Sequence, residues 1–383
     1  MKIGIAGPIT LGLIDFDFKG AKVPQTYSFP LIANLVNALV KRGHQVVVFT
    51  TSDEIDEAIC FKNEKITICI AKSESHPGRN FFRPVRRNLK ALMQQYPTDI
   101  INAHWSYEFA WAAIDSGIPT VVTVRDHATT ILKYQMIPYR AVRWIMNLIV
   151  LTKAKYLTTN SSYLKELLTK KQQEKAVVIS NFYTTGLERH FLDSATKGNY
   201  IVSINNGFDR RKNVESGLMA FAVIRKKFPT LKYHLLGAFM ETGSDAFQYA
   251  KKNNLLEGVE FIGYKPFAEL LEEIKHAKLL LHTSREESFG NVVLEAMVVG
   301  TPVVGGKNSG NIPFLLLHGK AGEICDIDDP DDIAKSASKI LNDEKYEAQL
   351  RDTAHKYAVE NFSEESILTA YINQYKRVLE NEK

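Results

Sequence analysis

The chain has 383 residues, of which 45% are hydrophobic and 24% are charged. This composition is ordinary for a soluble globular protein and excludes a disordered, collagen-like or coiled-coil chain, while the length is sufficient for two domains. The longest strongly apolar stretches, such as residues 145–151, are far shorter than the roughly 18 residues of a membrane-spanning helix. We therefore expect two globular domains and no segment that crosses a bilayer.

The charge is unevenly distributed along the chain. The net charge is only +5, but residues 1–190 contain 24 basic and 15 acidic residues, a net charge of +9 for that half. A basic N-terminal half favours an anionic partner, such as phosphate groups or an acidic membrane surface. Ordinary solvated lysines explain the same excess equally well, so both interpretations stay open.

The N-terminus and the cysteines indicate a cellular compartment. Residues 1–8 form an apolar run that is too short for a signal peptide and is broken by Gly7 and Pro8. The three cysteines, Cys60, Cys69 and Cys325, are too few and too scattered for a disulfide framework or a zinc cluster. We therefore expect a cytoplasmic protein.

Short β-branched runs alternate with longer helical patterns along the whole chain, which is typical of parallel sheets covered by helices on both faces. In the first half we expect strands at residues 2–6, 45–49, 66–70, 99–103, 120–124, 156–159 and 176–179. In the second half we expect them at residues 200–204, 233–236, 259–262, 279–281 and 302–304. The predicted fold class is α/β, with two doubly wound Rossmann-like domains.

The domain boundary is predicted from a change in pattern. Residues 181–199 mix Gly, Thr, Ser and Asn without periodicity, so we place the linker there, between a first domain at 1–190 and a second at 197–362. Residues 363–383 begin with Ser363, a good N-cap, followed by two glutamates, and predict a terminal helix that packs back on the first domain.

The most informative segment is residues 284–304, which predicts a loop, a helix and a strand. Gly290 and Asn291 open the helix, where first-turn N–H groups and the positive end of the helix dipole attract an anion such as a diphosphate. Glu287 precedes the helix and Glu295 lies on it. Eight helical residues span about 12 Å, close to the distance between the ends of a nucleotide sugar. The alternative is a helix start with two solvated glutamates.

This segment resembles the E-x7-E motif of the retaining glycosyltransferases of family 4, also called group 1, which have the GT-B fold of two domains facing across a cleft. The resemblance implies that Glu287 holds hydroxyls of the donor sugar and that Glu295 bonds the nucleotide ribose. It also implies that the residues between them contact the donor through the backbone, namely Ser288, Phe289, Gly290 and Asn291.

A second match lies at residues 204–213, where the family has an arginine and a lysine that contact the donor diphosphate. Lys212 matches the lysine, and a cation there would stabilise charge that develops on the leaving diphosphate. The arginine position is Asn206 in this chain. This departure implies that part of the phosphate contact is missing or is supplied by Arg210 or Arg211.

In the first half, His104 ends a predicted strand, at the sheet edge where open α/β folds bind ligands. By resemblance it faces the donor sugar and the acceptor, so we take it as catalytic with Lys212 and Glu287. Residues 123–127 resemble the family's T-x-H-D segment, with Arg125 in place of the histidine. Asp126 and His127 are candidates for the acceptor side, and a buried structural hydrogen bond is an equally good interpretation of them.

The loop after the first strand departs from the family, because it lacks the usual glycine pair. Gln25, Thr26, Tyr27 and Ser28 lie where the next helix is expected to begin. They are candidates either for acceptor contacts or for capping that helix. Gly43 is expected to end the same helix in a left-handed conformation.

No metal site or cofactor is predicted. Two D-x-D sequences, at residues 15–17 and 326–328, resemble the metal-binding motif of another glycosyltransferase fold. After the second one, Asp329 and Pro330 fit the cap and first residue of a helix, so a helix start is the better interpretation there. Two segments, residues 81–87 and 138–149, combine basic and large apolar side chains. Either could contact a membrane surface, and a helix packed on its sheet explains the second equally well.

These observations predict a metal-independent enzyme that transfers a sugar, with retention of configuration, from a nucleotide sugar to a glycan or lipid-linked acceptor. The nucleotide expected first is UDP, then GDP, and the expected setting is surface polysaccharide or glycoconjugate assembly, with no nucleic acid partner. Two alternatives stay open, namely a nucleotide-sugar epimerase or hydrolase on the same fold, and a silent nucleotide-binding partner.

Overall fold

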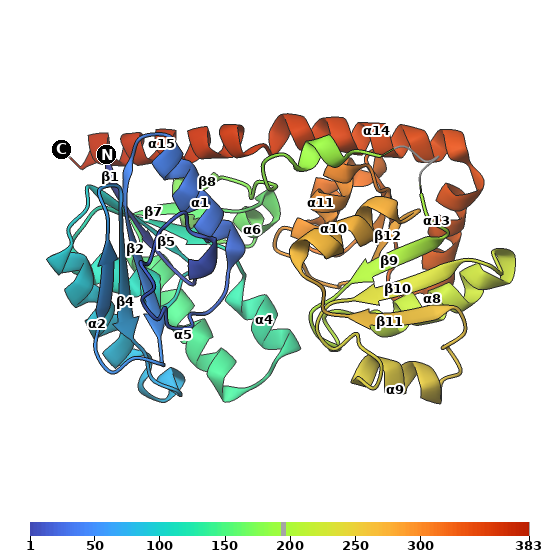
Figure 1. Ribbon diagram of the computed structural model, residues 1–383, viewed down its shortest axis with the longest axis horizontal. Helices are drawn as coiled ribbons and strands as arrows, with labels where there is room; N and C mark the ends of the chain where they lie inside the picture. The colour runs from blue at the N-terminus through green and yellow to red at the C-terminus, as the bar shows by residue number, and fades with distance from the viewer. Residues whose placement is uncertain (193–196, 383) are drawn as a thin grey trace. The chain divides into compact units, whose positions relative to one another are not determined.

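The computed structural model describes residues 1–192 and 197–382 (Figure 1). The chain divides into two compact units. The first comprises Met1–Phe182 together with the C-terminal helix, and the second is Tyr183–Ser363. In each unit, helices cover both faces of a central sheet (Figure 1). In the described part of the chain, no helix combines the length and apolar character needed to cross a bilayer.

The first unit contains an eight-stranded sheet in the order β3-β4-β2-β1-β5-β6-β7-β8. Its strands are β1 (Lys2–Ala6), β2 (Gln45–Ser52), β3 (Ile59–Lys62), β4 (Ile66–Lys72), β5 (Ile100–His104), β6 (Thr120–Val124), β7 (Tyr156–Thr159) and β8 (Ala176–Val178). All pairs are parallel except β3 with β4. The strand order reverses between β1 and β5, which creates a ligand-binding position at their carboxyl ends.

The helices of the first unit bury apolar stripes on the two faces of this sheet. They are α1 (Pro30–Lys41), α2 (Arg83–Gln95), α3 (Glu108–Ser116), α4 (Ala128–Tyr134), α5 (Pro138–Lys153), α6 (Ser162–Glu166), α7 (Lys170–Lys175) and α15 (Glu364–Asn381), with short 3₁₀ turns at Leu11–Leu13 (η1) and Pro77–Asn80 (η2). One core contains side chains of α1 and α15, and the other contains side chains of α2, α3 and α5.

The second unit contains a six-stranded parallel sheet in the order β11-β10-β9-β12-β13-β14. Its strands are β9 (Tyr200–Ile204), β10 (Lys232–Leu236), β11 (Val259–Gly263), β12 (Leu280–His282), β13 (Val303–Gly306) and β14 (Glu323–Cys325). Its helices are α8 (Val214–Lys227), α9 (Asp245–Lys252), α10 (Phe267–His276), α11 (Asn291–Val299), α12 (Ile312–Leu315), α13 (Pro330–Asn342) and α14 (Glu344–Asn361), with 3₁₀ turns η3 (Leu187–His190) and η5 (Leu317–Gly319). The order reverses between β9 and β12.

The two-domain α/β fold predicted from the sequence is confirmed, with strand ends that shift by up to three residues. Two strands were missed, β3 and β14, because each is a short edge strand with little alternation between buried and exposed positions. Gly43 follows α1 with φ of 81°, and the side chain of Asp329 caps α13, as predicted.

The predicted linker differs from the structure at its first half. Tyr183 and Leu187 are buried in a core of the second unit together with residues of α11, and the backbone N–H of Leu192 donates to Val299. The second unit therefore begins at Tyr183 rather than near residue 197, because apolar contacts tie the segment 183–192 to it. Residues 193–196 of the predicted linker lie outside the described residues.

A line of buried polar contacts fixes α15 on the first sheet. The Tyr375 hydroxyl donates to Asn102 Oδ1 over 3.0 Å, and Asn102 Nδ2 donates to Thr123 Oγ1 over 2.8 Å. Thr123 in turn shares a hydrogen bond of 2.8 Å with Thr158 on β7. All four side chains are fully buried, so each depends on its neighbour for hydrogen bonding.

We predict that Tyr375→Phe lowers the free energy of unfolding by about 1–3 kcal/mol, because it leaves Asn102 Oδ1 buried without a donor. Urea denaturation at fixed pH measures the loss. The control is Tyr27→Phe, since Tyr27 is 76% exposed and should tolerate the change. Equal stability of the two variants would contradict the proposed anchoring of α15.

Candidate functional site

The candidate site of the second unit lies where the chain leaves the carboxyl ends of β9 and β12. Lys212 Nζ, from the loop before α8, is 2.7 Å from Glu287 Oε1, in the loop before α11, and 3.5 Å from Ser284 Oγ. The Lys212 and Glu287 side chains are only 13% and 18% exposed. Residues 75 positions apart therefore form one enclosed ion pair at the reversal of strand order.

Local backbone geometry aims Lys212 at this position. Asp209 Oδ1 accepts hydrogen bonds from the backbone N–H groups of Arg211 (2.9 Å) and Lys212 (3.0 Å), which folds the loop into a tight turn. The next residue, Asn213, has a left-handed φ of 52°, and its side chain donates to the Ile327 carbonyl over 2.8 Å. The turn and this anchor hold the lysine in place at the start of α8.

The loop that carries Glu287 is held by a second turn that the sequence analysis missed. The backbone N–H of Asn311 donates to the Glu287 carbonyl (2.9 Å), and Asn311 Nδ2 donates to the Phe289 carbonyl (3.0 Å). Gly310 packs so closely that a Cβ atom there would lie 2.3 Å from the Glu287 oxygen. Residues 308–311 are of types that are common in turns, so the sequence indicates a loop there. Nothing in the sequence indicates that this loop contacts Glu287.

His282 is a further buried group of this site that was not predicted. It ends β12, and its Nε2 lies 3.8 Å from Glu287 Oε1. Burial lowers the pKa of His282 to about 4, which the nearby Glu287 carboxylate only partly opposes, so the imidazole is neutral at pH 7. The rule that selected His104, a histidine at the end of a predicted strand, would have selected His282 as well.

The two glutamates differ in their electrostatic environment. Burial disfavours the charge of Glu287, but Lys212, His282 and Arg211 outweigh it and lower its pKa to about 2. Glu295, half-buried on α11, has no such compensation, and burial raises its pKa to about 8. At neutral pH the site therefore holds one ionised and one largely protonated carboxyl group, rather than two solvated glutamates.

The start of α11 has the predicted geometry. Gly290 has φ of 99°, a left-handed backbone conformation that strongly favours glycine. The Phe289 side chain is buried in the core, while Ser288 is half-buried and Asn291 is exposed. The backbone of this segment, rather than the Phe289 side chain, is thus the part that can face a ligand.

The departure at Asn206 is visible in the structure. Asn206 is exposed, and its Oδ1 accepts a hydrogen bond of 3.2 Å from the backbone N–H of Ala238. Arg210 is exposed too. Arg211 is half-buried and close enough to help lower the pKa of Glu287. Of the two arginines suggested as substitutes, Arg211 is therefore the one placed beside the ion pair.

In the first unit, His104 ends β5 and is fully buried. Its Nδ1 accepts a hydrogen bond of 3.0 Å from Arg125 Nε, and its Nε2 is buried without a partner in the described part of the chain. Burial, followed by the charge of Arg125, lowers the pKa of His104 well below its ordinary value.

The neighbouring candidates Asp126 and His127 have internal partners. The Tyr107 hydroxyl donates to Asp126 Oδ1 over 2.9 Å, and burial raises the pKa of Asp126. His127 Nδ1 is 2.7 Å from Thr130 Oγ1, and burial lowers the His127 pKa. The structural hydrogen bond that the sequence left open is therefore present at Asp126, and a contact with the acceptor stays a prediction for both residues.

The N-terminal loop does not cap α1, so that interpretation was wrong. The helix begins at Pro30 with Phe29 as its cap residue, and no side chain bonds its first turn. Thr26 Oγ1 instead donates to the Ile9 carbonyl (2.6 Å), and the Gln25 backbone N–H donates to Glu54 Oε2 (2.8 Å). Tyr27 is 76% exposed, which leaves it able to contact another molecule.

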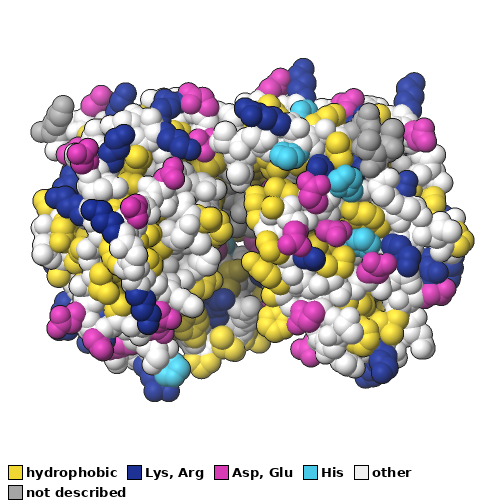
Figure 2. Space-filling model, viewed as in Figure 1, with side chains coloured by type: hydrophobic (Ala, Val, Ile, Leu, Met, Phe, Trp, Pro, Cys, Tyr) yellow, Lys and Arg dark blue, Asp and Glu magenta, His cyan; other side chains and the backbone are white. Residues whose placement is uncertain are grey.

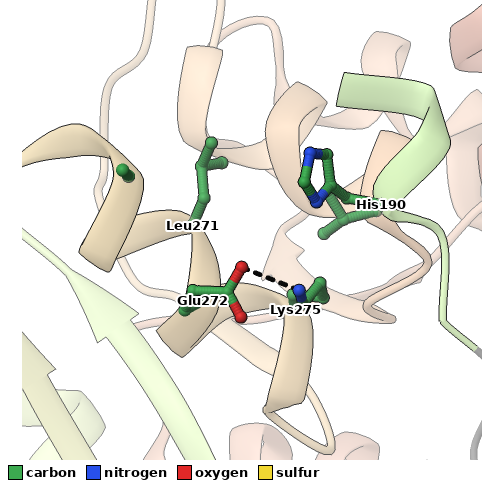
Figure 3. Close-up of a pocket in the computed structure, with 6 residues that line it drawn as sticks. His190, Leu271, Glu272 and Lys275 are labelled. Atoms are coloured by element: carbon green, nitrogen blue, oxygen red, sulfur yellow. Dashed lines mark hydrogen bonds and ion pairs between the residues drawn. The ribbon is translucent and has the colours of Figure 1, made fainter. Parts of the chain in front are cut away.

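Two further features lie outside this site. Among residues 1–192 and 197–382, no three His, Cys, Asp or Glu side chains gather as they would around a metal ion. A small cavity of about 130 Å³ lies between η3 and α10, where Glu272 and Lys275 form an ion pair of 2.7 Å beside His190 (Figure 3). It contains none of the candidate donor-site residues.

We predict that Glu295→Gln stabilises the nucleotide-free protein at high pH. The raised pKa of Glu295, about 8, means that wild-type stability is lost as the pH rises from about 4.5 through 8, whereas glutamine does not titrate. Because Glu295 is half-buried, we expect a relative gain of about 1–2 kcal/mol between pH 5 and pH 9.

Urea denaturation at both pH values measures this gain. The matched control is Glu287→Gln, for which the sign is opposite. The lowered pKa of Glu287, about 2, contributes stability that is present above pH 4.5 and is lost as the pH falls towards 2, so this variant should be less stable at neutral pH. A pH-independent effect of Glu295→Gln would refute the assignment.

Comparison with known proteins gives two family matches that adjoin along the chain. Residues 31–186 match the model described as "Glycosyltransferase Family 4", and residues 187–357 match the model described as "Glycosyl transferases group 1".

Among similar sequences, the N-acetyl-alpha-D-glucosaminyl L-malate synthase of Bacillus anthracis is 31% identical over 183 residues, 48% of this chain and 46% of that protein. The lipopolysaccharide core biosynthesis glycosyltransferase LpsE of Rhizobium meliloti is 28% identical over 203 residues, 51% of this chain and 56% of that protein. The matched regions thus span about half of each relative.

Solved structures extend the likeness to the whole fold. The sucrose-phosphate synthase of Thermosynechococcus elongatus superimposes with a TM-score of 0.79 at 18% identity, over 99% of both chains. The Anabaena HepE in complex with UDP gives 0.72 at 17% identity, over 98% of this chain and 100% of the other. With both halves matched by glycosyltransferase models and the fold shared along its full length, this chain belongs to the group 1 and family 4 glycosyltransferases of the GT-B fold.

Proposed function

We propose that this protein transfers a sugar from a nucleotide-sugar donor, bound by the second unit, to an acceptor bound by the first unit. The observation that carries this proposal is the buried Lys212–Glu287 ion pair of 2.7 Å beside the start of α11, with Glu295 on the same helix. An ionised carboxylate suits sugar hydroxyls, because it accepts their hydrogen bonds strongly. A protonated Glu295 could both donate to and accept from a ribose.

In the proposed reaction, Lys212 and the α11 N-terminus stabilise the diphosphate as the glycosidic bond breaks. Glu287 orients the sugar, and Glu295 orients the nucleotide. The leaving diphosphate takes the acceptor proton on the face from which it departs, so that the anomeric configuration is retained and no protein nucleophile is needed. No metal is required in this scheme, since Lys212 and the N-terminus of α11 offset the negative charge of the diphosphate.

UDP is the nucleotide we propose first, with GDP next. Two solved structures of the same fold, the Anabaena HepE with UDP and glucose and the Escherichia coli trehalose-6-phosphate protein with UDP-2-fluoro glucose, support this order for the donor. The name of the Rhizobium relative supports a setting in surface glycan assembly. Incubation with UDP- and GDP-sugars, with chelator present, tests the donor class and the absence of a metal requirement.

Product analysis separates this proposal from its alternatives. A transferase consumes donor only with an acceptor, and the anomeric coupling of the product in NMR reports retention. An epimerase or hydrolase consumes donor without an acceptor. A silent partner binds nucleotide but turns over nothing, which the unusual Asn206 and the absence of a cation at its position would explain.

We predict that Glu287→Gln and Lys212→Met each lower kcat at least about 100-fold, because the first weakens the hydrogen bonds that orient the sugar and the second removes a cation at the leaving diphosphate. The control is Lys265→Met, a half-buried lysine of the same unit that pairs with Glu269 away from the candidate site. Steady-state kinetics at saturating donor measure the effect, with thermal denaturation to confirm folding. Turnover of either site variant within tenfold of wild type would refute these roles.

We further propose that the acceptor is lipid-linked and that the first unit contacts an anionic membrane surface. Four large apolar side chains are exposed here: Phe81 directly after η2, Met136 (86% exposed) and Ile137 between α4 and α5, and Tyr139 in the first turn of α5. The two segments adjoin, since a Cβ at Gly78 would lie 3.1 Å from the Tyr139 ring. Figure 2 shows hydrophobic side chains gathered over α4 and the turn that follows it.

Basic side chains border this apolar surface, including the exposed Arg79, Arg83 and Lys133. Both segments leave the carboxyl edge of the sheet, after β4 and β6, which is the edge that carries His104 on β5. The combination of exposed apolar and basic side chains is typical of contact with anionic lipid headgroups. A membrane at this edge would present a lipid-linked acceptor to the candidate residues.

We predict that the double substitution Met136→Glu and Ile137→Glu lowers binding to anionic vesicles at least about tenfold, because it removes two insertable side chains and adds repulsion. Sedimentation with phosphatidylserine-containing vesicles measures binding, and phosphatidylcholine vesicles give the uncharged reference. The control is Phe239→Glu, 58% exposed in the second unit. Salt-insensitive or unchanged binding of the double variant would contradict the proposed surface.

A further inference from the structure

Arg125 is a buried cation without a carboxylate partner. The residue is only 5% exposed, and no ion pair of Arg125 occurs in the described part of the chain. Its guanidinium is held by neutral groups, because Nη1 donates to Asn181 Oδ1 over 2.8 Å and Tyr371 of α15 provides a further hydrogen bond. Buried charges are normally paired, so an unpaired guanidinium at the end of β6 calls for an explanation.

The guanidinium determines the protonation of His104. Arg125 Nε donates to His104 Nδ1 over 3.0 Å, and an arginine has no acceptor with which to receive a hydrogen bond in return. Nδ1 must therefore carry a lone pair, and the single proton of the neutral ring must lie on Nε2. Burial and the charge of Arg125 both lower the pKa of His104, so the ring does not gain a second proton at neutral pH.

The other side of the imidazole has no partner. His104 is 0% exposed, and its Nε2 makes no hydrogen bond in the described part of the chain. A buried N–H without an acceptor costs about 1–3 kcal/mol, and a catalytic role is one of the few explanations for such a group in a native protein. Next to it, Trp105 is held at a left-handed φ of 65°, a strain that also tends to accumulate at functional sites.

We propose that Arg125 is a positioning residue that holds His104 as a neutral imidazole with its proton on Nε2, so that His104 donates a hydrogen bond to an oxygen of the bound substrate. This arrangement is the reverse of a carboxylate–histidine pair. A carboxylate behind the ring would make Nε2 a base, whereas a guanidinium makes it a donor that cannot remove the acceptor's proton. That proton then leaves with the diphosphate, as in the proposed reaction.

The positive charge behind the ring also indicates which kind of oxygen His104 binds. Arg125 polarises the Nε2–H bond, and polarised donors bind electron-rich oxygens best. The partner of His104 is therefore an oxygen that carries or gains negative charge during transfer, on the sugar or its leaving group. The identity of this oxygen rests on the proposed function, whereas the protonation state of His104 does not.

Nitrogen NMR of the free protein labelled with ¹⁵N-histidine tests the protonation state without any turnover. The His104 signals are assigned by their loss in His104→Gln. We expect an unprotonated Nδ1 and a protonated Nε2 from pH 5 to pH 9 in wild type and in Arg125→Lys, which keeps a charged donor. In Arg125→Met we expect a mixture of tautomers. A protonated Nδ1 in wild type would overturn the proposal.

Two matched substitutions test the donor role. Glutamine places an amide N–H near the position of Nε2, whereas the shorter asparagine places it near Nδ1. We expect His104→Gln to keep at least about a tenth of wild-type kcat and His104→Asn to lose at least about 100-fold. Similar, severe losses in both would indicate a base and overturn the donor role, and near-normal kcat in both would overturn any contact in the transition state.

The NMR and turnover experiments distinguish a wrong role for Arg125 from a wrong proposed function. If no donor is turned over by the wild type, the proposed function fails, while the NMR result still decides whether Arg125 sets the tautomer. If transfer occurs with the opposite tautomer, the function stands and the inference fails. Thermal denaturation of every variant confirms that the loss of activity does not arise from unfolding.

Discussion

The ion pair between Lys212 and Glu287 is the interaction on which the candidate donor site depends. It joins two loops that are distant in sequence, and it compensates a carboxylate that burial alone would keep protonated. Glu295, on the helix that follows, has no such compensation, and burial raises its pKa to about 8. With Lys212 beside it, Glu287 is ionised and only accepts hydrogen bonds, whereas Glu295 is largely neutral and can also donate one.

The first unit uses a buried cation in a different way. Arg125 has no carboxylate partner and is stabilised by neutral groups, including Tyr371 of the C-terminal helix. Tyr375 of the same helix is bonded to Asn102, two residues before His104 on β5. The last helix of the chain thus supports the same sheet edge that carries the candidate histidine. This connection gives α15 a part in positioning the site, beyond covering one face of the sheet.

The sequence indicated candidate site residues but not the contacts that surround them. Glu287 and Glu295 were predicted from one motif and Lys212 from a second segment, and the structure brings Lys212 and Glu287 together. Gly290 was predicted because a helix start has a recognisable sequence. Asn311 and His282 were missed, since their importance comes from contacts with Glu287 that no local pattern records. The capping interpretation of residues 25–28 failed for a related reason, because Thr26 bonds a carbonyl of a distant loop.

The sequence by itself determined the α/β class, the two largely parallel sheets and the helix start at Gly290, because hydrophobic periodicity and helix-start chemistry act over a few residues. Only the tertiary structure decided which of these side chains are charged, which strand ends meet and where the second unit begins. Those properties depend on burial and on contacts between segments far apart in the chain. Glu287, beside a lysine from another loop, has a pKa of about 2, whereas Glu295, which only burial affects, has a pKa of about 8.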